Sequence, residues 1–379
     1  MSSEQGVTAA DGPHRSARRA GRVPMRTAVR RLARRIARVT SFARARPLNL
    51  ALQGGGAHGA FTWGVLDYLL EDGRLHIETI SGTSAGAMNA VVLASGLTVG
   101  GRDGARDALR QFWRSVSAAA HFSPIRRNPW DVLMGGWSLD SSPGFVLFDV
   151  LGRMASPYDW NPLDINPLRP VLDSVIDWQA VHCCNEVKLF ISATNVRTGK
   201  VRVFHNDELT CTALMASACL PLVFQAVEID GDPYWDGGYS GNPVLFPFAY
   251  QASSPDIVIV QINPIEHDAT PRTAREILNR VNEITFNSSL LKELRAINFV
   301  ARLLDEGKLD TAHYKKMLVH RIHADDALGA LSASSKINAE WPFLEHLFDI
   351  GRTAAERWLN SHYEQLGAES TINVPQVIR

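Results

Sequence analysis

The feature that most constrains the fold is a short apolar strand, a glycine-containing turn and a helix, an order that occurs twice within residues 48–94. In each case an apolar strand pattern leads into the turn, and apolar residues at helical spacing follow it. Such units make neighbouring strands parallel and pack the helix between them onto the sheet. The six segments are, in chain order, 48–53, 54–59, 60–72, 77–80, 82–86 and 87–94. The sequence therefore predicts an α/β fold with a mostly parallel sheet.

Further apolar segments extend this predicted sheet, and long helical patterns follow it. The candidate strands are 187–194, 201–204 and 256–262. Helical periodicity covers 272–306 and 340–366. Residues 121–170 mix proline, glycine and aromatic residues without a sustained period, which is typical of a lid or an insertion.

The net charge of zero conceals two opposite regions. Residues 1–47 contain twelve arginines against Glu4 and Asp11, so this tail carries a net charge of +10 and the rest of the chain −10. From 26 to 39, apolar residues and arginines fall on opposite helical faces, a pattern typical of helices that bind anionic membranes. A solvated basic arm and an organellar transit peptide are the alternatives.

The chain divides into three predicted parts. These are the basic tail 1–47, a catalytic core 48–264 with the possible insertion 121–170, and a mainly helical C-terminal extension 265–379. No apolar run reaches the length that a membrane-spanning helix needs.

The four cysteines have neither metal-ligand nor secretory disulfide spacing. They are Cys183, Cys184, Cys211 and Cys219. We interpret them as reduced, buried thiols, which fits a reducing cytoplasm. We expect no cleaved secretory signal and no metal or organic cofactor.

Ser84 is the candidate nucleophile. It is the centre of a G-x-S-x-G pentapeptide between Gly82 and Gly86, and this pentapeptide lies between a strand and a helix. The sharp turn needs small residues on both sides to expose the hydroxyl. The following helix N-terminus would favour developing negative charge at this position.

The glycine loop 54–59 follows the first strand and opens a helix. Successive glycines let backbone N–H groups converge on one point, which an oxyanion hole requires. The same string satisfies G-x-G-x-x-G, which in a strand–helix–strand unit also cradles a dinucleotide. The loop alone therefore fits either an oxyanion or the pyrophosphate of a dinucleotide.

The candidate base is Asp236, followed by Gly237 and Gly238. An Asp before two glycines is by itself a common turn. In combination with Ser84, however, a carboxylate within hydrogen-bond reach can take the hydroxyl proton, an effect worth roughly 10² to 10⁴-fold in rate.

Together the three motifs resemble the patatin-like phospholipase family of bacterial type. The resemblance covers about residues 48–264 and implies a three-layer α/β/α fold with a Ser84–Asp236 dyad and no cofactor. It also implies an oxyanion hole from the backbone of Gly54, Gly55 and Gly56. The glycines Gly59, Gly82, Gly86, Gly237 and Gly238 support the motifs.

One loop position departs from the family pattern. His58 stands where the family commonly carries Arg or Lys. A neutral imidazole there would suit an uncharged ester better than a phosphate head group. A histidine satisfied by packing is the alternative interpretation.

Two other function classes compete. An α/β-hydrolase would use a Ser-Asp-His triad, with His267, His313, His320 or His323 as the late histidine. A dinucleotide-binding protein would use the loop 54–59 with Glu71, Asp72 or Glu78 as the ribose acid. A non-catalytic membrane or granule scaffold held by the Arg-rich tail is a third.

The resemblance implies fatty-acyl esters of phospholipids or other glycerolipids as substrates. We expect a cytoplasmic protein, peripheral at the inner membrane surface or at a lipid or polymer granule. Nucleic acid is a weaker candidate partner because no aromatic interleaving accompanies the arginines. Trp130 and Trp137 suggest an apolar lid or acyl channel within 121–170, and plain packing in the core is the alternative interpretation.

Overall fold

The computed structural model describes residues 45–267 and 270–378. Ala45–Arg379 form one compact unit. The basic amphipathic segment predicted over 26–39 lies outside the described residues. The predicted tail boundary at 47 falls inside the first strand, which begins at Arg46.

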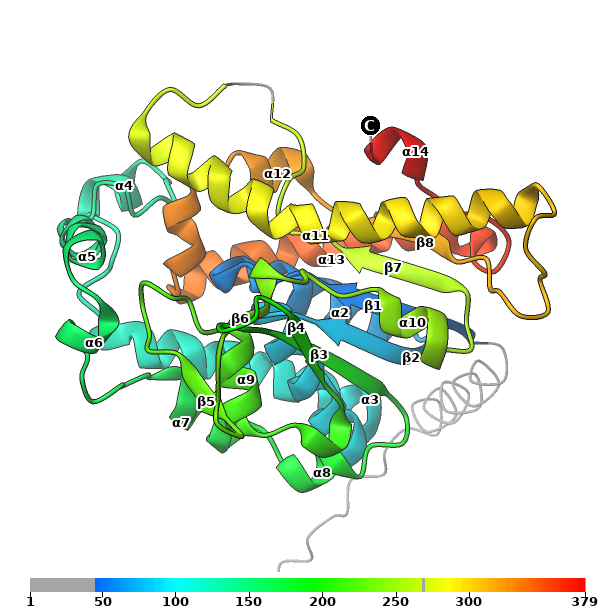
Figure 1. Ribbon diagram of the computed structural model, residues 1–379. Coiled ribbons are helices and arrows are strands. Elements are labelled where there is room, and N and C mark those ends of the chain that lie inside the picture. Colours follow the sequence, from blue (N-terminus) through cyan, green and yellow to red (C-terminus); the bar gives the residue numbers. More distant parts are fainter. Residues whose placement is uncertain (1–44, 268–269, 379) are drawn as a thin grey trace, which may run out of the picture. The chain divides into compact units, whose positions relative to one another are not determined.

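The described chain forms an eight-stranded sheet with the order β5-β6-β3-β2-β1-β7-β8, and β4 pairs with β3 (Figure 1). The strands are β1 (Arg46–Leu52), β2 (Leu75–Gly82), β3 (Lys188–Asn195), β4 (Val201–Phe204), β5 (Val227–Ile229), β6 (Asp232–Asp236), β7 (Asp256–Val260) and β8 (Leu318–Ile322). From β3 to β8 all neighbours along this order are parallel, whereas β4, β5 and β6 pair antiparallel. The predicted mostly parallel sheet is confirmed.

Helices cover both faces of this sheet (Figure 1). They are α2 (Gly59–Asp72), α3 (Ala85–Ala119), α4 (Pro129–Leu133), α5 (Pro143–Met154), α6 (Pro157–Trp160), α7 (Leu168–Val175), α8 (Trp178–His182), α9 (Cys211–Ser217), α10 (Phe246–Gln251), α11 (Ala274–Asp305), α12 (Asp325–Gly329), α13 (Trp341–His362) and α14 (Val374–Val377). The short 3₁₀ helices are η1 (Gly56–His58), η2 (Ala120–Phe122), η3 (Asn206–Glu208), η4 (Gly237–Tyr239), η5 (Ala333–Ile337) and η6 (Tyr363–Gln365).

Alternation along the central strands produces two cores. In β1, Leu48, Leu50 and Leu52 enter the core that α2, α3 and α13 cover. Ala51 enters the opposite core, with α10, α11 and α14. Successive strand side chains point to opposite faces, so a strand buried on both sides reads as a continuous apolar run. This confirms the three-layer α/β/α architecture.

The C-terminal extension contributes a strand that the sequence did not predict. β8 pairs in parallel with β7 and completes one edge of the sheet. The sequence likewise did not predict β6, which ends at Asp236 and pairs with β3. The helix expected over 87–94 continues to Ala119, with non-helical backbone at Gly100 and Gly101.

The predicted insertion 121–170 contains the short helices α4, α5 and α6. Trp137 packs against Phe343 and stacks on His346 of α13, so it belongs to the packed body. Trp130 is instead exposed. Among the cysteines, Cys184 and Cys219 are buried as expected, but Cys183 is exposed. No helix within the described ranges is long and apolar enough to cross a bilayer.

Candidate active site

The Ser84 turn joins β2 to α3 in a strained conformation. Ser84 has φ 53° and ψ −121°, a left-handed φ that L residues rarely adopt. A Cβ on Gly86 would lie 2.2 Å from the Leu52 carbonyl oxygen, and one on Gly82 would lie 2.8 Å from the Gly86 oxygen. The flanking glycines are therefore required by close backbone approach, as the pentapeptide predicts.

Asp236 lies at the end of β6, which β3 holds by antiparallel pairing. Its side chain is fully buried. Oδ1 accepts a hydrogen bond of 2.7 Å from the Gly238 amide, whereas Oδ2 has no hydrogen-bond partner among the described residues. A Cβ on Gly237 would lie 2.3 Å from the Ser192 carbonyl oxygen, so the residue after Asp236 must be glycine.

The environment of Asp236 keeps its carboxyl group basic. Burial raises the pKa of Asp236 to about 7, and the Gly238 amide and the nearby Ser84 hydroxyl oppose this rise. The Ser84 hydroxyl therefore stands beside this carboxylate. A carboxylate with an unused oxygen and a pKa near neutrality can take up a proton.

Hydrogen bonds tie the Ser84 turn to the segment that follows Asp236. The Thr83 hydroxyl interacts with Ser192 Oγ at 2.6 Å and donates to the Gly241 carbonyl at 2.7 Å. The Ser84 amide donates to Ser217 Oγ at 2.9 Å. The sequence offered no signal for Ser192 and Ser217, because both hydroxyls stand in ordinary buried segments.

The glycine loop reaches the nucleophile directly. A Cβ on Gly54 would lie 2.7 Å from the Cβ of Ser84. The Gly54 amide, however, donates to Asn242 Oδ1 at 2.7 Å and is not available to an oxyanion. Within the described residues, the amides of Gly55, Gly56 and Ala85 donate to no protein acceptor. The amides free to serve the predicted oxyanion hole are therefore those of Gly55, Gly56 and Ala85, and the hole itself stays a prediction.

His58 is a packed residue of the loop. It is 2% exposed, and Nε2 lies 2.7 Å from Ser335 Oγ. Burial and the charge of Lys336 lower the pKa of His58 to about 3, so the imidazole is neutral. Because the Ser335 hydroxyl donates to the Ser332 carbonyl, Nε2 carries the proton. The proposed influence of His58 on head-group selectivity stays a prediction.

The four late histidines have other partners. His267 pairs with Glu283, His313 with Asp310, His320 with Asp256 and His323 with Asp325. None of them contacts Ser84 or Asp236 within the described chain.

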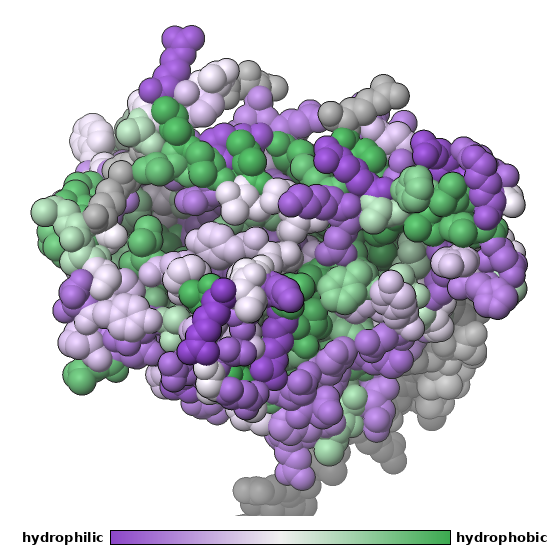
Figure 2. Space-filling view, in the orientation of Figure 1, coloured by the Kyte–Doolittle hydropathy of each residue, from purple (hydrophilic) through white to green (hydrophobic). Residues whose placement is uncertain are grey.

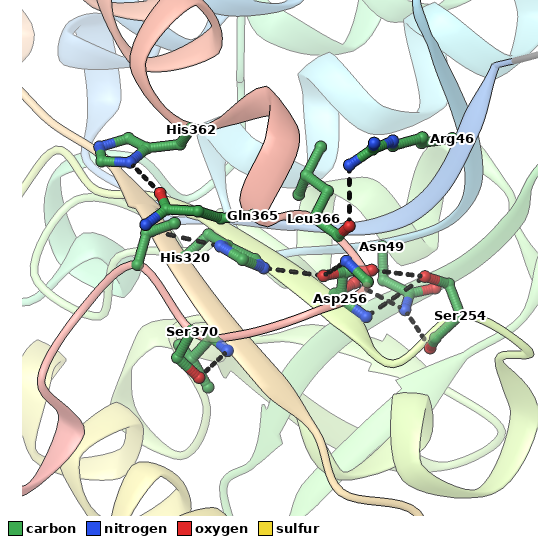
Figure 3. Close-up of polar contacts among 12 residues, drawn as sticks. Arg46, Asn49, Ser254, Asp256, His320, His362, Gln365, Leu366 and Ser370 are labelled. Carbon is green, nitrogen blue, oxygen red and sulfur yellow. Dashed lines mark hydrogen bonds and ion pairs between the residues drawn. The ribbon is translucent and has the colours of Figure 1, made fainter.

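His320 and Asp256 form a buried pair of the kind that a triad uses, but they lie elsewhere (Figure 3). His320 of β8 pairs with Val258 of β7, which pairs with Leu50 of β1, which in turn pairs with Ile80 of β2. Ile80 lies four residues before Ser84. This separation is roughly 13 Å along the strands and roughly 14 Å across them. Among the described residues, the geometry therefore offers Ser84 a carboxylate and no histidine.

The three acids considered for a dinucleotide ribose are also engaged. Glu71 pairs with Arg106 and Arg352, Asp72 with Arg74, and Glu78 accepts from Ser253 and Ser254. Because Ser84 itself packs against Gly54, the nucleophile turn fills the space beside the loop. The arrangement argues against the dinucleotide interpretation.

A strained serine turn and a glycine loop that meet at the carboxyl ends of parallel strands are the arrangement of α/β serine hydrolases. The family model that matches is described as patatin-like phospholipase and covers residues 50–249. This is more than half of the chain, so the chain belongs to the patatin-like phospholipase family, which supports a lipid acyl hydrolase. Among curated protein sequences, none matches the chain.

The chain also aligns with two solved structures. VipD from Legionella pneumophila aligns with a TM-score of 0.40 and 14% identity, over 84% of this chain and 67% of its own. ExoU in complex with SpcU, from the type III secretion system of Pseudomonas aeruginosa, aligns with a TM-score of 0.28 and 16% identity, over 82% of this chain and 54% of its own. The chain thus spans about half the length of ExoU.

Proposed function

We propose that this protein hydrolyses fatty-acyl esters of phospholipids or other glycerolipids through an acyl-enzyme, with Ser84 as nucleophile and Asp236 as general base. One observation carries the proposal. The Oδ2 atom of Asp236 has no partner among the described residues, and the carboxylate stands beside the Ser84 hydroxyl. An unsatisfied buried oxygen is costly and calls for a functional explanation.

The proposed reaction has two steps. Asp236 takes the Ser84 proton while Oγ attacks the ester carbonyl, and the amides of Gly55, Gly56 and Ala85 donate to the oxyanion. The intermediate collapses, the proton passes from Asp236 to the departing alcohol, and the acyl group stays on Ser84. Water then attacks the acyl-enzyme while Asp236 takes its proton. The bond between the acyl group and Ser84 breaks, Asp236 returns the proton to Ser84 Oγ, and the fatty acid leaves.

Two variants test this proposal. Ser84→Ala and Asp236→Asn should each lower fatty-acid release from lipid vesicles by at least about 10³-fold. A fluorophosphonate probe should label the native protein and leave Ser84→Ala unlabelled. Near-normal release by Asp236→Asn would refute the dyad, and the absence of both labelling and turnover in the native protein would favour a scaffold.

The approach to lipid belongs to the same proposal. No described side chain of α5 is buried, although α5 carries several apolar residues. The side chains Leu133, Met134, Leu147, Leu151 and Met154, which we call the apolar face, are 46–80% exposed. Figure 2 shows hydrophobic residues gathered at the left, where α4 and α5 lie in Figure 1.

The apolar face is connected to the candidate site through one loop. Tyr158 and Asn161, which follow α5, hydrogen-bond to Ala226 and Gln225. Gln225 and Ala226 lie in the loop between α9 and β5. Cys219 is in the same loop, and its carbonyl accepts a hydrogen bond from the Asp236 amide. We propose that the apolar face meets the lipid surface, and that the basic tail adds attraction to anionic lipid at a cytoplasmic membrane or granule.

A further inference from the structure

The candidate oxyanion donors stand in a loop whose orientation is fixed by two buried amide side chains. Asn242 Oδ1 accepts a hydrogen bond from the Gly54 amide, and Asn263 Nδ2 donates one of 2.7 Å to the Gly54 carbonyl oxygen. Asn242 is fully buried and Asn263 is 1% exposed. Both hydrogen-bonding groups of Gly54 are thereby satisfied from outside the loop.

The bond to the Gly54 carbonyl also sets the direction of the next amide. A trans peptide is planar, so its C=O and N–H point in opposite directions. The Gly54 carbonyl and the Gly55 N–H belong to one such plane. While Asn263 holds the carbonyl, the Gly55 N–H must point away from Asn263.

Lys336 determines which way the Asn263 amide faces. The Nζ atom of Lys336 donates a hydrogen bond of 2.9 Å to Asn263 Oδ1. Burial lowers the pKa of Lys336 and the charge of Glu283 opposes this effect; in its ammonium form the group has donors and no acceptor, so the oxygen of Asn263 faces it. The Nδ2 group must then turn toward the Gly54 carbonyl. A reversed amide would place N–H against N–H at Lys336 and oxygen against oxygen at Gly54.

The main chain around Lys336 covers the loop as well. Gly56 has φ 60°, and a Cβ there would lie 2.3 Å from the Lys336 carbonyl oxygen. The neighbouring Ser335 accepts from His58 at the end of the loop. The short helix η5 in the C-terminal extension therefore contacts the loop directly at Gly56 and His58, and it reaches Gly54 through Asn263.

We infer that Lys336 is a positioning residue: through Asn263 it orients the peptide between Gly54 and Gly55, and so the Gly55 amide that the proposed oxyanion hole uses. The inference rests on the proposed function for its catalytic consequence. Its structural part, the orientation of the loop, stands independently of any turnover.

The decisive variant is Lys336→Met, which keeps the length of the side chain and removes its donors. We expect kcat to fall about 10- to 100-fold while KM changes less than about twofold, because a misdirected donor affects the transition state more than binding. Lys336→Arg keeps donor and charge and should recover most of the rate. Lys308→Met, an exposed lysine paired with Glu306, is the control and should change nothing.

A double variant of Lys336 and Asn263 distinguishes a positioning role of Lys336 from a general loss of stability. Asn263→Ala should lower kcat by itself, and adding Lys336→Met should cost little more, since both variants disrupt one hydrogen-bonded chain. A multiplicative loss in the double variant would overturn the inference. So would an unchanged kcat in Lys336→Met.

Hydrogen exchange provides a readout that does not depend on activity. In Lys336→Met, amide exchange in a peptide covering residues 50–60 should accelerate, whereas Lys308→Met should match the native protein. Unchanged exchange in this peptide would refute the inference. If the native protein neither labels nor turns over and exchange still accelerates, the proposed function fails while the positioning role holds.

Discussion

Asp236 is the residue whose chemistry is set most strongly by its surroundings. Its sequence context, an Asp before two glycines, predicted a possible base but no particular basicity. Full burial raises the pKa of its carboxyl group to about 7, and the one backbone donor, the Gly238 amide, opposes this rise only in part. The burial depends on tertiary packing, including the pairing of β6 with β3, so no local sequence pattern could predict it.

The raised pKa of Asp236 predicts an acidic limit to activity. The base must be ionised before it can accept the Ser84 proton, so kcat/KM should fall about tenfold per pH unit below about pH 7 and level off above it. The check is the pH profile on a soluble ester between pH 5 and 9. If kcat/KM instead began to fall only near pH 4, the assignment of Asp236 as the base would be contradicted.

A second carboxylate offers a matched control for this profile. Burial also raises the pKa of Glu293 to about 7, while its carboxylate accepts from the amides of Leu245 and Phe246. Glu293→Gln keeps an acceptor oxygen and removes the titration. We expect the fall in kcat/KM at acidic pH to persist in this variant. If it disappeared, Glu293 would be the group that titrates.

Other residues of the site could not be read from the sequence. Asn242, Asn263 and Lys336 act on the glycine loop from far along the chain, and amides and lysines occur everywhere. Only the tertiary contacts distinguish them from surface residues. The glycines were predictable because close backbone approach excludes other residues at those positions.

At the scale of elements, the strand–turn–helix units of the core followed from apolar periodicity. β8 did not, because His320 and Arg321 interrupt its apolar run. Its burial depends on a partner that the sequence does not reveal: Asp256 accepts from the His320 ring in the interior. A buried polar residue is tolerated only where such a partner exists.

The contact between α2 and α13 depends on two facing glycines. A Cβ on Gly64 would lie 2.0 Å from the Phe348 oxygen, and one on Gly351 would lie 2.1 Å from the Phe61 oxygen. Gly351→Ala should therefore force the helices apart and lower the free energy of unfolding by about 2–3 kcal/mol. Chemical denaturation measures this loss.

The matched control is Gly100→Ala, at a glycine with open space around it. We expect the free energy of unfolding of this variant to stay within about 0.5 kcal/mol of the native value. Equal losses in the two variants would show that helix packing is not the cause.

At the scale of the whole molecule, the basic tail and the apolar face predict separable contributions to lipid binding. Removing residues 1–44 should weaken flotation with anionic vesicles and reduce its salt dependence. Leu147→Ser with Leu151→Ser should weaken flotation with zwitterionic vesicles too, and slow hydrolysis of vesicle lipid. The deletion ends at 44 because Arg46 belongs to β1.

A monomeric short-chain ester is the control substrate for both variants. Its hydrolysis should match that of the native protein, since neither change touches Ser84 or its surroundings. Equal flotation of all three proteins would reject both surfaces as lipid contacts. A parallel loss on the monomeric ester would instead indicate damage to the site.

The first strand of the sheet is held by the last part of the chain. Arg46 donates to the Leu366 carbonyl at 2.9 Å, and the Gly367 amide donates to Asp256 (Figure 3). Lys336 completes the loop beside Ser84 from the same late region. During synthesis on the ribosome these residues emerge long after Ser84 and the glycine loop. A nascent chain thus carries its candidate nucleophile well before the groups that we infer orient the loop, so the proposed activity must wait for both.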